Sequence, residues 1–190
     1  MAYSYVKKNH DITYGAIMSF RENTAGTNII LTGFMATGKT TIGRLLASQL
    51  GYEFVDTDRL IEDRCGLTIA EIFQEKGETV FRSMEADVAR ELGGKEGLVI
   101  ATGGGLALDP ANVAALKSRG RIFCLVATPE AIMGRASSDA VVRPLLEGSN
   151  PMERIMELIK EREKAYMHFT QVDTTGKTPD EVVGILLACL

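Results

Sequence analysis

The sequence predicts an α/β fold with three layers, in which a five-stranded parallel sheet lies between two layers of helices. Five short apolar runs alternate with segments of helical periodicity, a pattern typical of parallel sheets covered on both faces. In addition, three polar or glycine-rich segments each follow a predicted strand directly. Because ligands in such sheets bind at the carboxyl ends of the strands, these segments should open onto one ligand-binding face.

The predicted elements follow one another along the chain with few interruptions. The strands cover residues 28–32, 53–55, 98–101, 122–126 and 171–173. Helices are predicted at 40–50, 59–65, 69–76 and 78–92, from 110, from 129, at 151–168 and from 179. The crossover connections between parallel strands should be right-handed.

Helix starts carry clear sequence signals. Thr68 and Glu71 form a capping box before the helix at 69–76. Proline occupies a first helical position directly after each of Asp109, Thr128, Asn150 and Thr178.

Size and composition are ordinary for a globular domain. The chain has 190 residues, of which 45% are hydrophobic and 24% charged, and a formal net charge of −4. The negative charge argues against non-specific binding to nucleic acid or anionic membranes, and no apolar run reaches the roughly 20 residues of a membrane span. Since there are only two histidines, neither a zinc site nor a Ser-His-Asp triad is expected.

The N-terminal segment and the cysteines indicate the domain organisation and the cellular compartment. Residues 1–26 show no periodicity, so we expect a flexible N-terminal extension followed by a single domain at 27–190. Two alternatives for this segment stay open. Translation could start at Met18, or residues 1–26 could contain a short organelle-targeting peptide. Three cysteines, odd in number and far apart, fit reduced thiols in a cytoplasmic protein, which we expect to be a monomer.

A phosphate-binding loop anchors the predicted ligand face. Residues 33–40 read G-x-x-x-x-G-K-T between a strand and a helix. The glycines let backbone N–H groups surround a phosphate, and the helix N-terminus adds partial positive charge. In such loops the lysine, here Lys39, reaches the β- and γ-phosphates, and the hydroxyl of Thr40 binds Mg²⁺. The alternative is a glycine-rich turn that only joins a strand to a helix.

Two carboxylates follow the second predicted strand. Asp56 and Asp58 lie two residues apart where the strand gives way to a loop. Phosphoryl transfer requires one carboxylate near Mg²⁺ and another that orients the attacking hydroxyl. The alternative is that Asp58 is the N-cap of the following helix.

Two further features each have a functional and an ordinary interpretation. Gly103, Gly104 and Gly105 suit either backbone that approaches a ligand closely or a sharp turn between strand and helix. Arg82 is either an anion-binding residue or a surface residue paired with Glu85 at i+3.

A polar, irregular segment at 136–150 is flanked by arginines. Arg135, Arg143 and Arg162 lie in or beside it, as in a mobile lid that closes over phosphates and excludes water. Arg162 has an ordinary alternative, a solvated helix face, because charged residues surround it in the sequence.

Together these residues resemble the shikimate kinase family over about residues 27–189. The phosphate loop alone occurs in many kinases, and the order of the other pieces is more specific. The matching pieces are G-F-M-A-T-G-K-T-T-I-G-R-L-L-A, F-V-D-T-D, I-A-E-I-F, G-E-x-x-F-R-x-x-E, A-T-G-G-G, V-R-P-L-L and the R-x-x-x-Y of Arg162 to Tyr166. The resemblance implies a P-loop kinase architecture with a mobile lid at about 136–150.

The resemblance implies sites for ATP and Mg²⁺. It implies that Thr40 ligates Mg²⁺ directly and that Asp56 acts on it through water. The implied ATP-binding residues are Ala36, Thr37, Gly38, Lys39, Thr40, Thr41, Arg135, Arg143 and Lys177.

The resemblance also implies a substrate site. Asp58 matches the carboxylate that binds the shikimate hydroxyls, and Arg82 and Arg162 match the arginines that bind its carboxylate. The implied substrate-binding residues are Asp58, Arg82, Gly103, Gly104, Gly105 and Arg162, with Phe73 and Phe81 as pocket walls. The implied catalytic residues are Asp58, Lys39 and Arg143.

The implied reaction is ATP-dependent phosphorylation of the 3-hydroxyl of shikimate, giving 3-phosphoshikimate and ADP, a step of chorismate and aromatic amino-acid biosynthesis. One alternative is another small-molecule kinase of the same fold, such as a gluconate kinase or a nucleoside monophosphate kinase. The other is a non-catalytic nucleotide-binding regulator. The extension at 1–26 lies outside the family pattern.

Overall fold

The structure, a computed structural model, describes residues 26–138 and 150–190. Except for Gly26, the predicted extension lies outside the described residues. Arg143 and most of the predicted lid also lie outside them.

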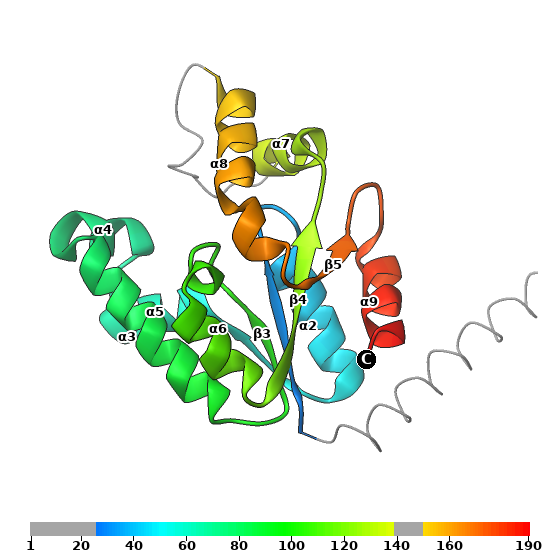
Figure 1. The fold of residues 1–190 in the computed structure, drawn as a ribbon, viewed down its shortest axis with the longest axis horizontal. Helices are drawn as coiled ribbons and strands as arrows, with labels where there is room; N and C mark the ends of the chain where they lie inside the picture. The colour runs from blue at the N-terminus through cyan, green and yellow to red at the C-terminus, as the bar shows by residue number, and fades with distance from the viewer. Residues whose placement is uncertain (1–25, 139–149) are drawn as a thin grey trace, which may run out of the picture.

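Five parallel strands form the sheet predicted from the sequence. They are β1 (Asn28–Gly33), β2 (Glu53–Asp56), β3 (Leu98–Ala101), β4 (Gly120–Val126) and β5 (Thr170–Asp173). Their spatial order is β2-β3-β1-β4-β5, and every neighbouring pair is parallel. The central strand β1 therefore lies between β3 and β4, and the phosphate loop begins at its carboxyl end (Figure 1).

Helices connect these strands and cover the sheet (Figure 1). They are α2 (Lys39–Leu50), α3 (Thr57–Cys65), α4 (Ile69–Lys76), α5 (Glu78–Gly93), α6 (Pro110–Lys117), α7 (Pro129–Ser138), α8 (Pro151–Tyr166) and α9 (Pro179–Ala188). A short 3-10 turn, η1 (Leu106–Leu108), which the sequence did not predict, follows the glycines after β3.

Alternation along each strand divides the core between the two faces of the sheet. Ile29 and Leu31 of β1 pack with α2 and α9, whereas Ile30 between them packs with α5 and α6. The same alternation places Val99 on the first side and Ile100 on the second. The central strands β3, β1 and β4 are thus buried on both faces, which confirms the predicted three layers.

A third cluster lies where α7 and α8 meet the phosphate loop. Phe34 of the loop is buried against Ile132 of α7 and against Ile155 and Leu158 of α8. This packing fixes the loop against the two helices that flank residues 139–149 in the sequence.

Four predicted boundaries were wrong by two residues or more. The strand predicted from Ile122 begins at Gly120. The helix predicted from Arg59 begins at Thr57, because Asp56 rather than Asp58 is its N-cap. The helix predicted to end near His168 ends at Tyr166. The segment predicted as irregular from 136 is helical up to Ser138, since α7 continues to that residue.

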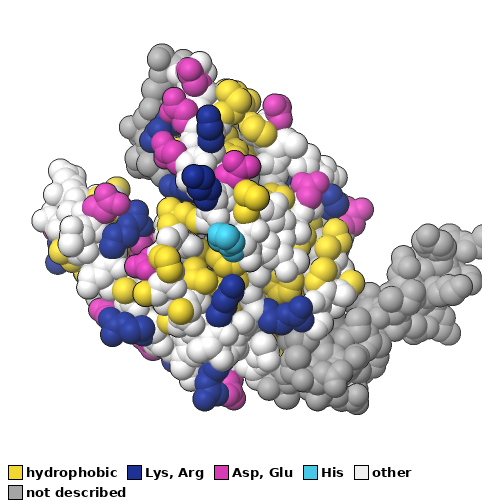
Figure 2. All heavy atoms as spheres, viewed as in Figure 1, with side chains coloured by type: hydrophobic (Ala, Val, Ile, Leu, Met, Phe, Trp, Pro, Cys, Tyr) yellow, Lys and Arg dark blue, Asp and Glu magenta, His cyan; other side chains and the backbone are white. Residues whose placement is uncertain are grey.

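The surface carries charges of both signs. Figure 2 shows Lys and Arg dispersed among Asp and Glu over the visible face, and a hollow between the region of α4 and that of α8. None of the helices within the described ranges is long and apolar enough to cross a membrane.

Candidate active site

The phosphate loop has the backbone that the motif predicts. Gly33 and Gly38 have φ angles of 131° and 96°, which favour glycine. At Gly33 a β-carbon would also collide with the carbonyl oxygen of Leu125. Gly38 is the N-cap of α2 and has no side chain that could occupy the helix N-terminus, so the N–H groups of the first turn can bind an anion.

Side chains of the loop turn inward. The Lys39 ammonium donates to the carbonyl oxygens of Gly33 and Phe34, at 3.0 and 2.9 Å. The Thr37 hydroxyl donates to the same carbonyl of Phe34 at 2.8 Å. Lys39 is therefore held over the loop where a phosphate would lie, whereas Thr41 in the first turn of α2 is exposed.

Thr40 and Asp56 supply two oxygens at the carboxyl ends of β1 and β2. The Thr40 hydroxyl donates to Oδ2 of Asp56 at 2.9 Å, and Oδ1 of Asp56 accepts from the backbone of Asp58 and Arg59. These are hard oxygen ligands of the kind that Mg²⁺ prefers. Among the described residues, no three His, Cys, Asp or Glu side chains form a set that could hold a metal ion. Two oxygens of this kind suit Mg²⁺, which usually keeps several water ligands and binds phosphate oxygens.

Asp58 is not a capping residue, contrary to the alternative interpretation of the sequence. Its side chain lies in the first turn of α3, whose N-cap is Asp56. Burial raises the pKa of Asp58 to about 6, helped by the negative charges of Asp56 and Glu85 and opposed by Lys39. A carboxylate with such a pKa is a stronger base than an exposed one and still ionises near neutral pH.

The three glycines after β3 each lie against a different candidate substrate residue. A β-carbon on Gly103 would collide with Oδ1 of Asp58, and one on Gly105 would collide with Nη1 of Arg82. At Gly104 a β-carbon would come within 3.0 Å of Nη1 of Arg162. The missing side chains therefore let one aspartate and two arginines from three helices approach one short stretch of backbone.

Arg82 is held by two carboxylates of its own helix, α5. Its Nη1 donates to Oε2 of Glu85 at 2.6 Å, while its Nε and Nη2 both donate to Oε1 of Glu78, at 3.2 and 3.0 Å. The predicted pairing with Glu85 is present, but it is not a surface pair, because the Glu85 side chain is only 2% exposed. Burial raises the pKa of Glu85, and the hydrogen bond from Arg82 opposes that rise.

One phenylalanine lies beside Arg82, and a second packs against the first. The ring of Phe81 is buried, with the guanidinium carbon of Arg82 5.5 Å from its centre. Phe73, on α4 and 37% exposed, lies 4.8 Å from Phe81 between ring centres.

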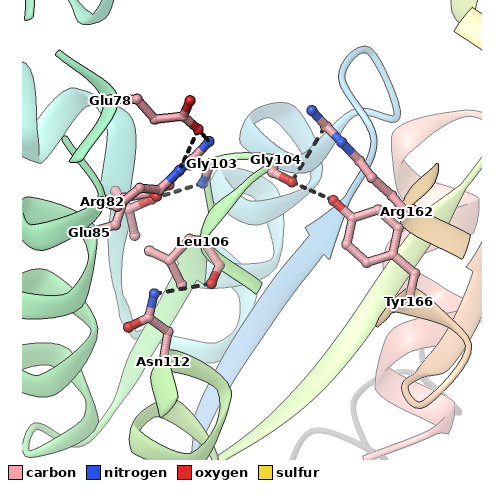
Figure 3. A network of polar contacts seen from close by, with 10 residues as sticks. Glu78, Arg82, Glu85, Gly103, Gly104, Leu106, Asn112, Arg162 and Tyr166 are labelled. Atoms are coloured by element: carbon pink, nitrogen blue, oxygen red, sulfur yellow. Dashed lines mark hydrogen bonds and ion pairs between the residues drawn. The ribbon is translucent and has the colours of Figure 1, made fainter. Parts of the chain in front are cut away.

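Arg162 faces the glycines rather than solvent, so the solvated-face alternative was wrong. Its Nη1 donates to the carbonyl oxygen of Gly104 at 3.5 Å, and its guanidinium carbon lies 5.5 Å from the centre of the Phe34 ring. Tyr166, one turn further along α8, donates its hydroxyl to the same carbonyl at 2.6 Å. Figure 3 shows Arg82 and its glutamates on one side of Gly103 and Gly104, and Arg162 and Tyr166 on the other.

Arg135 and Lys177 lie near the nucleotide side of the loop. Arg135 donates to the carbonyl of Ala36 at 3.2 Å and to both oxygens of Thr174, at 2.9 and 2.6 Å. Lys177 pairs with Asp173 at 3.2 Å. The implied nucleotide residues of the phosphate loop, of α7 and of the loop after β5 thus lie next to one another, while Arg143 lies outside the described residues.

Three residues of the site were not among the predicted site residues. Tyr166 binds the carbonyl of Gly104, Glu85 is the buried partner of Arg82, and the buried hydroxyl of Thr57 accepts from the backbone of Gly103 at 2.8 Å. Helical spacing was the available signal for the first two, since residues three or four apart share a helix face.

Comparison with known proteins connects this geometry to a family. A family model described as shikimate kinase matches residues 35–190. The chain is 45% identical over 159 residues to a shikimate kinase of Geobacter sulfurreducens, an alignment that covers 83% of this chain and 87% of that protein.

Solved structures agree with these matches. The shikimate kinase from Acinetobacter baumannii, in complex with shikimate, is similar with a TM-score of 0.81 and 36% identity, over 91% of this chain and 96% of that one. A gluconokinase from Sinorhizobium meliloti 1021 has a TM-score of 0.54 and 17% identity over 86% of this chain and 90% of that one, a likeness of fold alone.

Proposed function

This chain belongs to the shikimate kinase family, and on that premise we propose that it transfers the γ-phosphoryl group of ATP to the 3-hydroxyl of shikimate through the residues described above. The products are 3-phosphoshikimate and ADP. The observation that carries the proposal is the approach of Asp58, Arg82 and Arg162 to three consecutive glycines beside the phosphate loop. One carboxylate and two guanidinium groups are the complement of a small polyol that bears a carboxylate.

The phosphate loop binds the triphosphate. The amides at the N-terminus of α2 and the ammonium of Lys39 neutralise the phosphate oxygens, and Lys39 exchanges its bonds to the loop carbonyls for bonds to phosphate. Arg135, bonded to Ala36 and to Thr174, supports the nucleotide side. Arg143, in the lid proposed around 136–150, adds positive charge to the transferred group.

Thr40 and Asp56 hold Mg²⁺ in this proposal. The ion, when bound, neutralises charge on the β- and γ-phosphates. The fit of this site to Mg²⁺ rests on the hydroxyl of Thr40 and Oδ2 of Asp56, which a hydrogen bond of 2.9 Å brings together. Thr40 would bind the ion directly, and Asp56 would bind it through water.

Asp58 is the base that receives the proton of the acceptor hydroxyl. The hydroxyl oxygen forms a bond to the γ-phosphorus, the bond from that phosphorus to the bridging oxygen breaks, and ADP leaves. A pKa of about 6 leaves Asp58 ionised at neutral pH and still basic enough to accept a proton. Most of the rate enhancement comes from positioning and from neutralising charge.

Arg82 and Arg162 bind the acceptor carboxylate from opposite sides of the glycines. The backbone of Gly103, Gly104 and Gly105 forms the floor between them. Phe81, buried beneath Arg82, and the exposed ring of Phe73 wall the substrate side.

The alternatives considered from the sequence are less well supported. Gluconate is also a polyol that bears a carboxylate, but the likeness to a gluconokinase is one of fold alone, at 17% identity. The family model and the 45% identical relative both favour shikimate as the acceptor. A non-catalytic regulator would not require a basic carboxylate beside the phosphate loop. We further propose that the protein is a monomer. We also propose a cytoplasmic location, which the free thiols of Cys65, Cys124 and Cys189 support.

The position of the phosphate in the product tests this proposal. Purified protein is incubated with ATP, Mg²⁺ and shikimate, and the product is examined by phosphorus and proton NMR. We expect phosphorus coupled to the proton on C3. Phosphate at another hydroxyl would contradict the assigned placement of the substrate. Chelation of Mg²⁺ should abolish turnover, and added Mg²⁺ should restore it.

A further inference from the structure

We propose that Glu78 is an internal competitor of the substrate: its carboxylate occupies the edge of Arg82 that the shikimate carboxylate uses, and so lowers the affinity for shikimate. This inference rests on the proposed function and concerns a residue to which that function gives no role.

The hydrogen bonds of Arg82 assign its two edges to different partners. Nε and Nη2 form the fork that binds a carboxylate with two parallel hydrogen bonds. Both atoms donate to the single oxygen Oε1 of Glu78, at 3.2 and 3.0 Å. The opposite atom, Nη1, donates to Glu85 at 2.6 Å. Glu78 thus stands where an incoming carboxylate would bind.

Two other sides of the guanidinium are occupied. Gly105 lies so close to Nη1 that even a β-carbon would not fit between them. The buried ring of Phe81 lies 5.5 Å from the guanidinium carbon. Of these three sides, the edge that Glu78 covers is the one that a ligand can open, because the Glu78 side chain is exposed.

The two glutamates differ in how easily they can be displaced. The Glu85 side chain is 2% exposed, and breaking a buried pair leaves an uncompensated charge. The Glu78 side chain is 65% exposed, and exposed pairs are weak. Glu78 is also the first residue of α5, where the helix N-terminus stabilises a negative charge after Arg82 is released. Glu85 is therefore the permanent partner of Arg82 and Glu78 the exchangeable one.

Calorimetric titration of the full-length protein with shikimate tests the inference. For Glu78→Gln, which keeps the shape and removes the charge, we expect a Kd two- to fivefold below that of the unchanged protein at low salt. Glu78→Ala should act in the same direction. Glu75→Gln, on the exposed surface of α4, is the matched control and should leave the Kd unchanged.

The methyl ester of shikimate separates competition from other effects. Because the ester has no carboxylate charge, Glu78→Gln should improve its binding far less than it improves that of shikimate. An equal gain for both ligands, or a Kd for shikimate that is unchanged or raised, would overturn the role of Glu78 alone. If the unchanged protein bound no shikimate, the proposed function itself would fail, and this inference with it.

Discussion

Oδ1 of Asp58 lies against the backbone of Gly103, in the space that a β-carbon at position 103 would fill. The backbone N–H of Gly103 in turn donates to Thr57, the residue before Asp58. Gly103 therefore contacts two consecutive residues of α3, Thr57 through its N–H group and Asp58 through its Cα. The Asp58 carboxylate can keep its position only because residue 103 has no side chain.

Gly103→Ala should displace the Asp58 carboxylate and lower kcat by roughly 10–100-fold, because small misplacements of a catalytic group are costly. Steady-state kinetics with shikimate and ATP measures the effect. Gly184→Ala on α9 is the control, since a β-carbon there meets nothing within 4 Å. A Gly103→Ala enzyme with normal kcat would show that Asp58 tolerates the movement, or that its position does not matter.

The pKa of Asp58 predicts a titration close to neutral pH. In the ligand-free protein the side-chain carboxyl carbon of Asp58 should titrate near pH 6, well above the ordinary value of 3.8. NMR of protein with labelled aspartate measures this, and Asp58→Asn identifies the resonance. The limb of kcat/KM at low pH should rise as Asp58 loses its proton. A carboxyl that titrates near pH 4 would contradict the effect assigned to burial.

The same pKa shift predicts that Asp58 lowers the stability of the fold at high pH. Because the folded protein holds the proton more tightly than the unfolded chain, stability falls as the pH rises from about 4 through about 6. Two pKa units correspond to about 3 kcal/mol. Asp58→Asn should therefore raise the free energy of unfolding by roughly 1–3 kcal/mol at pH 8 and by much less at pH 4. Denaturant unfolding at both pH values checks this, and equal effects at both would refute it.

The fold and part of the site could be predicted from the sequence because both depend on local patterns. The strand ends place the phosphate loop, Asp56 and the glycines at one edge of the sheet, whatever the details of packing. The roles of Arg82 and Arg162 were not decidable from local sequence. Arg162 has charged neighbours on all sides in the sequence, and only the packing of α8 against the phosphate loop turns it toward Gly104.

The local sequence also did not reveal which charged side chains are buried. Glu85 follows Arg82 at the spacing of an ordinary surface pair, yet its side chain is buried beneath the site. The N-cap of α3 was also not decidable from the local sequence, since both Asp56 and Asp58 are residues that suit an N-cap. The backbone of Asp56 is still extended at the end of β2, so Asp56 is the residue whose side chain accepts the N–H groups of the helix.

Tyr166→Phe should raise the KM for shikimate by roughly 3–10-fold and lower the free energy of unfolding by about 1 kcal/mol, the usual worth of one hydrogen bond. The lost bond is the 2.6 Å contact that holds the carbonyl of Gly104. Kinetics and denaturant unfolding measure the two effects. Met167→Leu, at an exposed position next to Tyr166, should change neither. A change in stability without a change in KM would reduce Tyr166 to a structural role.

The acceptor itself is tested most directly by ADP release. Purified protein with MgATP is assayed in a coupled reaction with shikimate, gluconate or a nucleoside monophosphate as the only acceptor. ADP formation should depend on shikimate, with the other two acceptors at the background of ATP hydrolysis. Absence of shikimate-dependent release, with turnover of gluconate or of a nucleoside monophosphate instead, would contradict the assignment of Asp58, Arg82 and Arg162 to a shikimate site.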